Sequence, residues 1–95
     1  MNGLSLAAAL PAELTQTQAS ACLRALLPCL KSSADSLVVV DASKLVRFDS
    51  AALAVLLELR RESLALGKRF AVQGLPARLR NLATLYGIAD LVPAA

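Results

Sequence analysis

Hydrophobic and polar positions form blocks along the chain that predict alternating strands and helices. Leu4–Leu10 is a short apolar block that ends at Pro11 and predicts a first strand. Leu37–Val40 is a continuous run of Leu-Val-Val-Val, which favours a strand covered on both faces. Phe70–Gln73 predicts a third short strand, which ends at Gly74.

A first helix is predicted between the first two strands. Thr15 or Thr17 can cap its start. The helix is expected to end near Leu27, because Pro28 disfavours a helical conformation in the residue before it. A polar turn, Lys31–Ser36, then leads into the second strand.

Two further helices follow, over Ser50–Leu66 and Pro76–Tyr86, and each is followed by a glycine that can end it. Ile88–Val92 is expected to pack back on the core as a short tail. The order is β-α-β-α-β-α, and strands joined by a helix are expected to run parallel. The pattern predicts a single α/β domain over residues 1–95, a sandwich with a small, mostly parallel sheet packed by helices.

The composition of the chain indicates which side chains form the core and which class of partner to expect. The 95 residues are 57% hydrophobic but 3% aromatic, so the core must consist of Leu, Val and Ala. A net charge of +3, dispersed along the chain, is too weak to predict a nucleic-acid surface. The mean hydropathy of +0.60 is high for a small domain and indicates surplus apolar surface. Such surface predicts a protein partner, and self-association is also possible.

Neither a membrane span nor a signal peptide is predicted. The longest unbroken apolar run, Ala51–Leu57, has seven residues, whereas a spanning helix needs roughly 20. The apolar stretch near the start has no basic residue before it, as a signal peptide would. These features favour a cytosolic protein.

The helix 50–66 is apolar over roughly 200° of its circumference, about twice the stripe needed to pack on one sheet. Two interpretations remain open: a neighbouring helix covers the excess, or one edge stays exposed as a docking strip. The wheel does not fix which arc faces the sheet. One arc contains Ala52, Val55, Leu56, Leu59 and Leu66, and the candidate docking strip contains Leu53, Leu57 and Leu64 beside Ser50, Arg60 and Arg61.

Asp49 and Ser50 lie at the start of this helix, and two roles are considered for them. Asp49 is a good N-cap residue and Ser50 an acceptable first helical residue. The start of a helix also favours added negative charge, so Ser50 is a candidate phosphorylation site. A phosphate there would place a charge of about −2 in the middle of the candidate strip.

The sequence predicts neither an enzyme nor a cofactor or metal site. There is no histidine, nucleophile-elbow motif or phosphate-binding loop motif. Asp41 and Asp49 flank one loop, and an enzyme using them would need a polar cleft between them. Cys22 and Cys29, about 10 Å apart if on one helix, are too distant for a disulfide and are expected to be small buried hydrophobes.

The segment from Leu37 to Val92 resembles the STAS domain, which anti-sigma-factor antagonists and sulfate-transporter tails share. The most specific part is a strand that ends in Asp41, a loop that closes on Asp49–Ser50, and the leucine-rich helix after it. The run QGLPARLRNLATLYGIADLV is similar to the MlaB-type STAS subunit of the Mla phospholipid-transport ABC system.

The MlaB-type resemblance implies a non-catalytic accessory subunit that binds the cytoplasmic ATPase and supports its assembly and activity. It implies association with the membrane only through the transporter complex. Asp49 would fix the start of the docking helix. The residues expected at the partner are Asp49, Ser50, Leu53, Leu57, Arg60, Arg61 and Leu64.

The alternative resemblance is to anti-sigma-factor antagonists, in which the hydroxyl corresponding to Ser50 is phosphorylated by the anti-sigma kinase. Antagonists usually read Asp-Ser-Ser-Gly, whereas this chain has Asp49–Ser50–Ala51–Ala52. Alanine in place of that glycine implies tighter packing at the helix start. One strand precedes the first helix here, where family members commonly have two.

Overall fold

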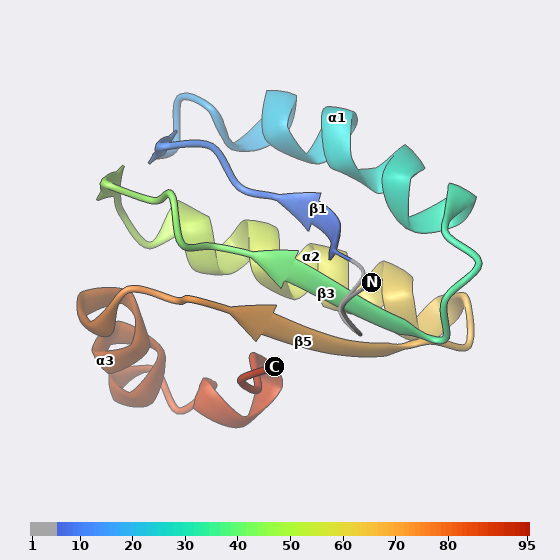
Figure 1. The fold of residues 1–95 in the computed structure, drawn as a ribbon. Coiled ribbons are helices and arrows are strands. Elements are labelled where there is room, and N and C mark those ends of the chain that lie inside the picture. Colours follow the sequence, from blue (N-terminus) through green and yellow to red (C-terminus); the bar gives the residue numbers. More distant parts are fainter. Residues whose placement is uncertain (1–5) are drawn as a thin grey trace.

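The computed structural model describes residues 6–95. The strands are β1 Leu6–Ala9, β2 Glu13–Leu14, β3 Leu37–Asp41, β4 Arg47–Phe48 and β5 Arg69–Gln73. The helices are α1 Ala19–Ser32, α2 Ala51–Ala65 and α3 Ala77–Leu85, followed by the 3₁₀ turn η1 Ala89–Leu91 (Figure 1). The predicted β-α-β-α-β-α order is confirmed, with β2, β4 and η1 added to it.

The main sheet has the strand order β1-β3-β5, and every pair in it is parallel. Leu37–Asp41 pairs in unbroken register with Arg69–Gln73. Val38–Val40 are at most 1% exposed, so the prediction of a central strand covered on both faces is confirmed. β1 covers Leu6–Ala9 of the predicted Leu4–Leu10, whose first two residues lie outside the described part of the chain.

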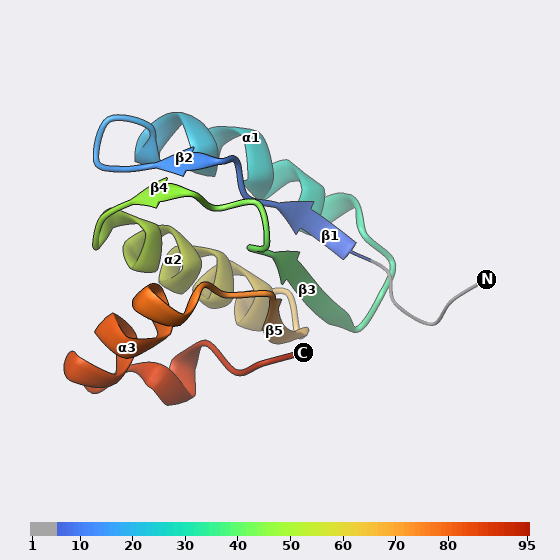
Figure 2. The ribbon, with the colours of Figure 1, turned by 60° about the vertical axis from the view of Figure 1, so that its left-hand side comes forward.

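A second, two-stranded parallel sheet joins β2 to β4 and was not predicted. Because β1 and β2 both precede α1, the expectation of one strand before the first helix is wrong. Glu13 pairs with Arg47, and Leu14 pairs with Phe48. The strands are too short to carry an alternating pattern. Leu14 is fully buried, so the small sheet is anchored in the core. Figure 2 shows β2 and β4 side by side, where they lead into the starts of α1 and α2.

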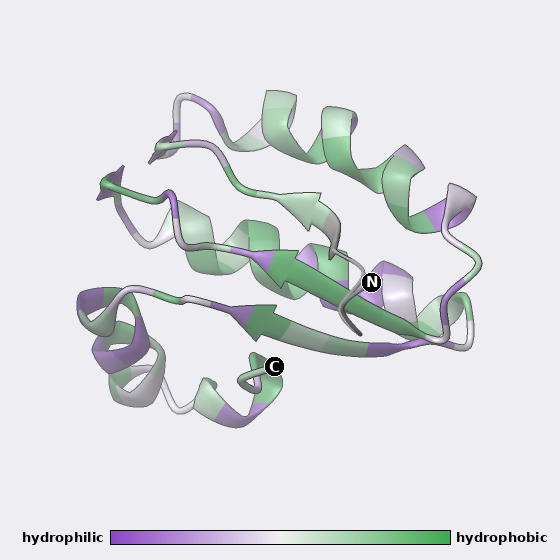
Figure 3. Ribbon diagram, in the orientation of Figure 1, coloured by the Kyte–Doolittle hydropathy of each residue, from purple (hydrophilic) through white to green (hydrophobic). Residues whose placement is uncertain are grey.

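The helices enclose an aliphatic core. α1 packs on α2 and β1, and α2 also contacts β5. α3 lies beyond the carboxyl end of β5 and contacts η1 (Figures 1 and 2). Figure 3 shows that apolar residues are concentrated in β3, β5 and α1. The largest fully buried side chains of the described residues are all Leu or Val, as composition predicts. Of the helices within residues 6–95, none combines the length and apolar character of a membrane-spanning segment.

The predicted end of α1 at Leu27 is wrong, because the helix continues through Pro28 to Ser32. The first residues of the expected polar turn are therefore helical. Pro28 is exposed and removes one backbone hydrogen bond from the helix. Beyond it, Leu30 is fully buried and its carbonyl accepts a hydrogen bond from Lys68 Nζ at 2.8 Å. These tertiary contacts offset the local cost of the proline.

The predicted boundaries of β3, α2, β5 and α3 agree with the structure to within one residue, including the stops of α2 and α3 before Gly67 and Gly87. The start of α1 differs, because its N-cap is Gln18 and not Thr15 or Thr17. The C-terminal tail packs back as expected: Val92 is fully buried and Ala94 forms a bridge to Val72 of β5.

Gly74 holds the loop after β5 close to the loop after β3. Its φ is +70°, and a Cβ there would lie 2.7 Å from Cβ of Ser43. Only glycine fits both the backbone conformation and the space. The close approach brings together the carboxyl ends of β3 and β5, from which the chain leads to the candidate site.

Candidate protein-docking site

The segment between β4 and α2 lies at the edge of the main sheet where its parallel strands end. β3 ends at Asp41, and the chain then passes through residues 42–46 to β4, Asp49 and Ser50. Figure 2 shows this segment leading from β4 into α2, beside β2 and the turn that precedes α1. Two segments more than 30 residues apart in sequence therefore share one end of the molecule.

Asp49 uses both carboxylate oxygens to bind backbone N–H groups. Oδ1 accepts a hydrogen bond from Ala51 N at 2.8 Å, at the first turn of α2. Oδ2 accepts one from Gln16 N at 3.2 Å, in the turn between β2 and α1. The predicted role of Asp49 at the helix start is supported by the first bond. The second bond links the turn to the start of α2. No sequence pattern predicted it, because Gln16 and Asp49 are 33 residues apart.

Ser50 occupies the N-cap position of α2, which begins at Ala51, so the predicted N-cap at Asp49 and the predicted helix start at Ser50 are each one residue too early. Its carbonyl accepts hydrogen bonds from the N–H groups of Leu53 and Ala54. Its side chain makes no capping bond, and the residue is exposed. Since Asp49 supplies the side-chain cap, the Ser50 hydroxyl is at the surface and can bind another molecule.

Leu53 is 2% exposed and belongs to the core, so its place in an exposed docking strip is wrong. The buried face of α2 combines Leu53 with most of the arc that begins at Ala52, whereas Leu66 of that arc is 40% exposed. Ser63 lies on the same face, and its hydroxyl donates to the carbonyl of Leu59 at 2.7 Å. The buried residues are Ala52, Leu53, Val55, Leu56, Leu59 and Ser63.

An exposed line of side chains nevertheless runs along α2. Leu57 is half-buried and packs against the core, whereas Leu64 is 48% exposed. Ala54, which the sequence interpretation did not include, is exposed between Ser50 and Leu57. The spacings of three, four and seven residues place these side chains on one helical face. We call this face the outer strip; its residues are Ser50, Ala54, Leu57, Arg61 and Leu64.

The charge on the outer strip comes from Arg61. Its guanidinium lies 3.5 Å from Glu58 Oε2, and its side chain is largely exposed. An exposed pair of this kind contributes about 0.3–0.5 kcal/mol and leaves the cation accessible. Arg60, also expected at the partner, is half-buried at the margin of the strip.

Other large apolar side chains are exposed outside the outer strip. Val46 and Leu85 are each 77% exposed, and Leu66 and Tyr86 are also exposed. Sequence reasoning did not single out Val46, which stands in a short segment without a repeating pattern, or Leu85, which is the last residue of α3. Val46 directly precedes β4 and is therefore close to the site.

The carboxylates of Asp41 and Asp49 both accept hydrogen bonds from backbone N–H groups. Asp41 Oδ1 accepts from Ser43 N at 2.9 Å. The Ser43 hydroxyl and backbone N–H lower the pKa of the Asp41 carboxyl below its ordinary value. Within residues 6–95, no three His, Cys, Asp or Glu side chains gather as metal ligands would.

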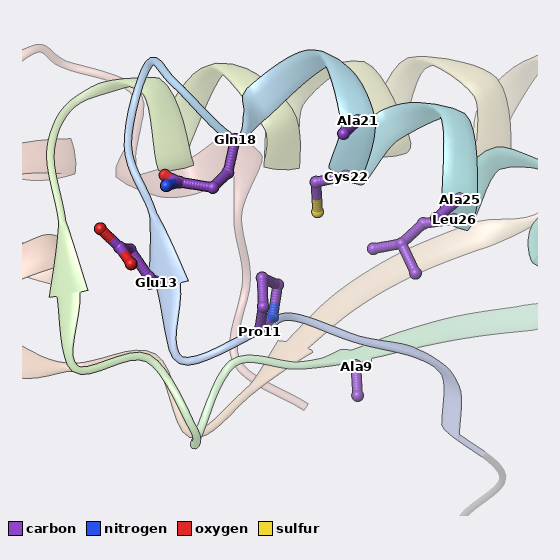
Figure 4. Close-up of a pocket in the computed structure, with 8 residues that line it drawn as sticks. All are labelled: Ala9, Pro11, Glu13, Gln18, Ala21, Cys22, Ala25 and Leu26. Atoms are coloured by element: carbon purple, nitrogen blue, oxygen red, sulfur yellow. The ribbon is translucent and has the colours of Figure 1, made fainter.

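A pocket of about 390 Å³ lies elsewhere, between the end of β1 and α1. Figure 4 shows the Cys22 thiol and the Leu26 side chain pointing into it from α1. Burial raises the pKa of the Cys22 thiol. Cys22 and Cys29 are both free, as predicted, but Cys29 is half-buried and not fully buried. The lining residues are Ala9, Pro11, Glu13, Gln18, Ala21, Cys22, Ala25 and Leu26.

Comparison with known proteins agrees with the architecture. The model of the family described as "Mlab, STAS domain" matches residues 4–93. Comparison with curated protein sequences finds no significant match.

Solved structures show the same fold at low sequence identity. The anti-sigma factor antagonist SpoIIAA in its unphosphorylated form superposes with a TM-score of 0.71 at 15% identity, covering 99% of this chain and 84% of the other. A sulfate transporter family protein from Wolinella succinogenes gives 0.68 at 13% identity, covering 94% and 74%. The SulP transporter STAS domain from Vibrio cholerae gives 0.64 at 16% identity, covering 90% and 66%.

Proposed function

Because the chain belongs to the family of MlaB-like STAS domains, we propose that it is a non-catalytic accessory subunit of a phospholipid-trafficking ABC transporter. It binds the cytoplasmic ATPase of that transporter and supports its assembly and activity. Its place is then in the cytoplasm, held at the inner membrane through the complex. The family match over residues 4–93 is the observation that carries the proposal.

The outer strip of α2 supplies the docking surface in this proposal. It presents a hydroxyl at Ser50, a guanidinium at Arg61 and an exposed aliphatic side chain at Leu64. Half-buried Leu57 connects this surface to the core, so a partner on the strip would rest on a rigid helix. Leu53 takes no part, because it is buried.

Binding at the strip would act on the ATPase by selecting one of its conformations. A bound subunit shifts a conformational equilibrium only as far as its affinities for the two conformations differ. We infer that this chain binds more tightly to the ATPase conformation that is competent for dimerisation and nucleotide hydrolysis.

Leu64 and Leu66 provide a matched pair for the test. They are 48% and 40% exposed, but Leu66 follows the last turn of α2 outside the outer strip. Leu64→Asp should weaken binding to the purified ATPase subunit about 10- to 150-fold, the value of one leucine buried at an interface. Leu66→Asp should change the affinity less than about threefold. Isothermal titration calorimetry measures both, with circular dichroism to check folding.

Failure of the wild-type chain to bind the ATPase would overturn the proposed function. Equal binding by wild type and the folded Leu64→Asp variant would show that the outer strip is not the docking surface.

The second candidate function is that of an anti-sigma-factor antagonist regulated by phosphorylation of Ser50. The exposed Ser50 hydroxyl and the similarity to the SpoIIAA fold favour it. Ala52 weighs against it, because its side chain is fully buried where antagonists usually have glycine. The helix start is therefore packed more tightly than a glycine would allow.

Incubation with ATP and a cognate anti-sigma kinase separates the two functions. Stoichiometric phosphoserine at Ser50, found by mass spectrometry and lost in Ser50→Ala, would establish the antagonist function and overturn the ATPase-subunit proposal.

A further inference from the structure

Val46 is an exposed aliphatic side chain on a firmly held backbone. Its side chain is 77% exposed, yet its N–H donates to the carbonyl of Ala12 at 2.8 Å. The N–H of Arg47 donates to the same carbonyl at 3.0 Å. The backbone of residues 46 and 47 is therefore fixed beside the start of β2. The Val46 side chain is held in an exposed position as a result.

The turn Thr15–Gln18 is a second rigid exposed segment. The N–H of Gln18 donates to the carbonyl of Thr15 at 3.0 Å, which closes a four-residue turn. Gln18 Oε1 in return accepts from the N–H and the hydroxyl of Thr15, at 2.8 and 2.7 Å. Neither Thr15 nor Thr17 caps α1 as predicted, since Gln18 holds the N-cap position. Gln16 and Thr17, at the tip of the turn, are exposed.

Three links hold this turn beside Val46 and Ser50. β2 pairs with β4, and buried Leu14 anchors the pair in the core. Glu13 forms an exposed ion pair with Arg47 at 3.6 Å, which contributes little by itself. Asp49 Oδ2 accepts the N–H of Gln16 at 3.2 Å.

From this arrangement we propose that the docking surface continues from Ser50 across Val46 to the tip of the Thr15–Gln18 turn. The inference rests on the proposed function and adds a second half to the outer strip. Val46 is its apolar anchor, and Gln16 and Thr17 form its polar rim, the arrangement that interfaces use. Asp49 is a positioning residue, because its oxygens bind backbone N–H groups within the chain.

The charges of this surface indicate the kind of partner surface that fits. Both oxygens of Asp49 are already bonded to N–H groups, and Glu13 faces Arg47. Arg47 is paired with Glu13, but its side chain is 79% exposed, so its guanidinium stays accessible to a carboxylate of a partner. The surface fits a region of the ATPase with an apolar hollow for Val46 and a carboxylate beside it.

Val46 and Leu85 form the matched pair for the test, because both are 77% exposed and Leu85 lies at the end of α3. Val46→Asp should weaken binding to the purified ATPase subunit about tenfold or more, whereas Leu85→Asp should change it less than about twofold. Isothermal titration calorimetry gives both affinities. Wild-type affinity in Val46→Asp would overturn the inference.

Gln16→Pro removes the N–H donor to Asp49 together with the Gln16 side chain of the rim, and leaves the carboxylate and Val46 unchanged, so it tests the part of the surface that the turn contributes. Proline is favoured at the second position of such a turn, so the turn should survive while the N–H donor to Asp49 is lost. The affinity should fall about 3- to 10-fold, with the melting temperature within about 2 °C of wild type. Wild-type affinity in this variant would remove the turn from the surface.

Outcomes for the inference and for the proposed function are distinguishable. If wild type binds, and Leu64→Asp weakens binding while Val46→Asp and Gln16→Pro do not, the inference fails and the proposed function stands. If wild type does not bind the ATPase, both fail.

Discussion

The guanidinium carbon of Arg78 lies 4.9 Å from the centre of the Phe48 ring, which links α3 to β4. Phe48 is half-buried and packs against the core, whereas Arg78 is exposed. A cation over an aromatic face at this distance is attracted by the ring quadrupole. The contact ties α3 to the segment that leads into Ser50, so the proposed docking surface would have support from α3 as well as from β2.

A double-mutant cycle at Phe48 and Arg78 should show coupling. Phe48→Leu keeps an apolar side chain but removes the ring face, and Arg78→Ala removes the cation. We expect a coupling free energy of about 0.5–1 kcal/mol in urea unfolding, the value of a cation–π contact at an exposed site. Strictly additive effects would mean that the two side chains do not interact in solution.

Truncation of Leu53 and of Leu64 on α2 should lower the free energy of unfolding by clearly different amounts. Leu53→Ala removes a core side chain and should lower the free energy of unfolding by about 2–5 kcal/mol. Leu64→Ala should lower it by less than about 1 kcal/mol, because the side chain is half in water already. Chemical denaturation measures both. A small loss for Leu53→Ala would place that side chain at the surface and restore it to the docking strip.

The pattern along α2 predicted the helix but not which leucines it buries. A helical wheel reports angular position, and Leu53 and Leu64 lie only about 20° apart on it. Their burial differs because Leu53 lies among core residues at the start of the helix, whereas Leu64 lies near its exposed end. That difference depends on where neighbouring elements end, which is tertiary information.

The strands were predictable because β3 and β5 are continuous apolar runs in a parallel sheet. β2 and β4 escaped prediction because two-residue strands are defined by each other and not by their own sequences. The same holds for the bond between Asp49 and Gln16, which joins groups 33 residues apart. The bond from Asp49 to the first turn of α2 was foreseen, because such residues at helix starts are read from local sequence, although the N-cap position falls on Ser50.

Lys68 should be a main support of the C-terminal end of α1. Its ammonium donates to the carbonyls of Leu30 and Ser33, which the helix leaves without partners. Lys68→Met keeps the aliphatic stem and should lower the free energy of unfolding by about 1.5–3 kcal/mol. Urea unfolding gives the value, and hydrogen exchange should show the loss concentrated in the last turn of α1.

Lys31→Met is the matched control for Lys68→Met. Lys31 is exposed in the last turn of the same helix, so its loss should remove only a favourable interaction with the helix dipole, about 0.3–1 kcal/mol. Equal losses in the two variants would show that charge near the helix end matters and that the two hydrogen bonds of Lys68 do not.

Asp41 should make folding stability depend on pH in the acid range. The Ser43 hydroxyl and backbone N–H lower the pKa of this carboxyl in the folded protein below its ordinary value of 3.8. A depressed folded-state pKa gives stability that is present above 3.8 and lost as the pH falls through the folded-state value. Asp41→Asn should therefore be less stable than wild type at pH 7, and the difference should close below pH 3.8.

Ser43→Ala separates the hydroxyl from the rest of the Asp41 environment. It removes the largest cause of the lowered pKa but leaves the backbone N–H that donates to Asp41 Oδ1 at 2.9 Å. The carboxyl pKa, followed by NMR titration, should then move up towards 3.8 without reaching it. An unchanged pKa in Ser43→Ala would assign the shift to the backbone alone, and a wild-type carboxyl that titrates at 3.8 would contradict the predicted pH dependence.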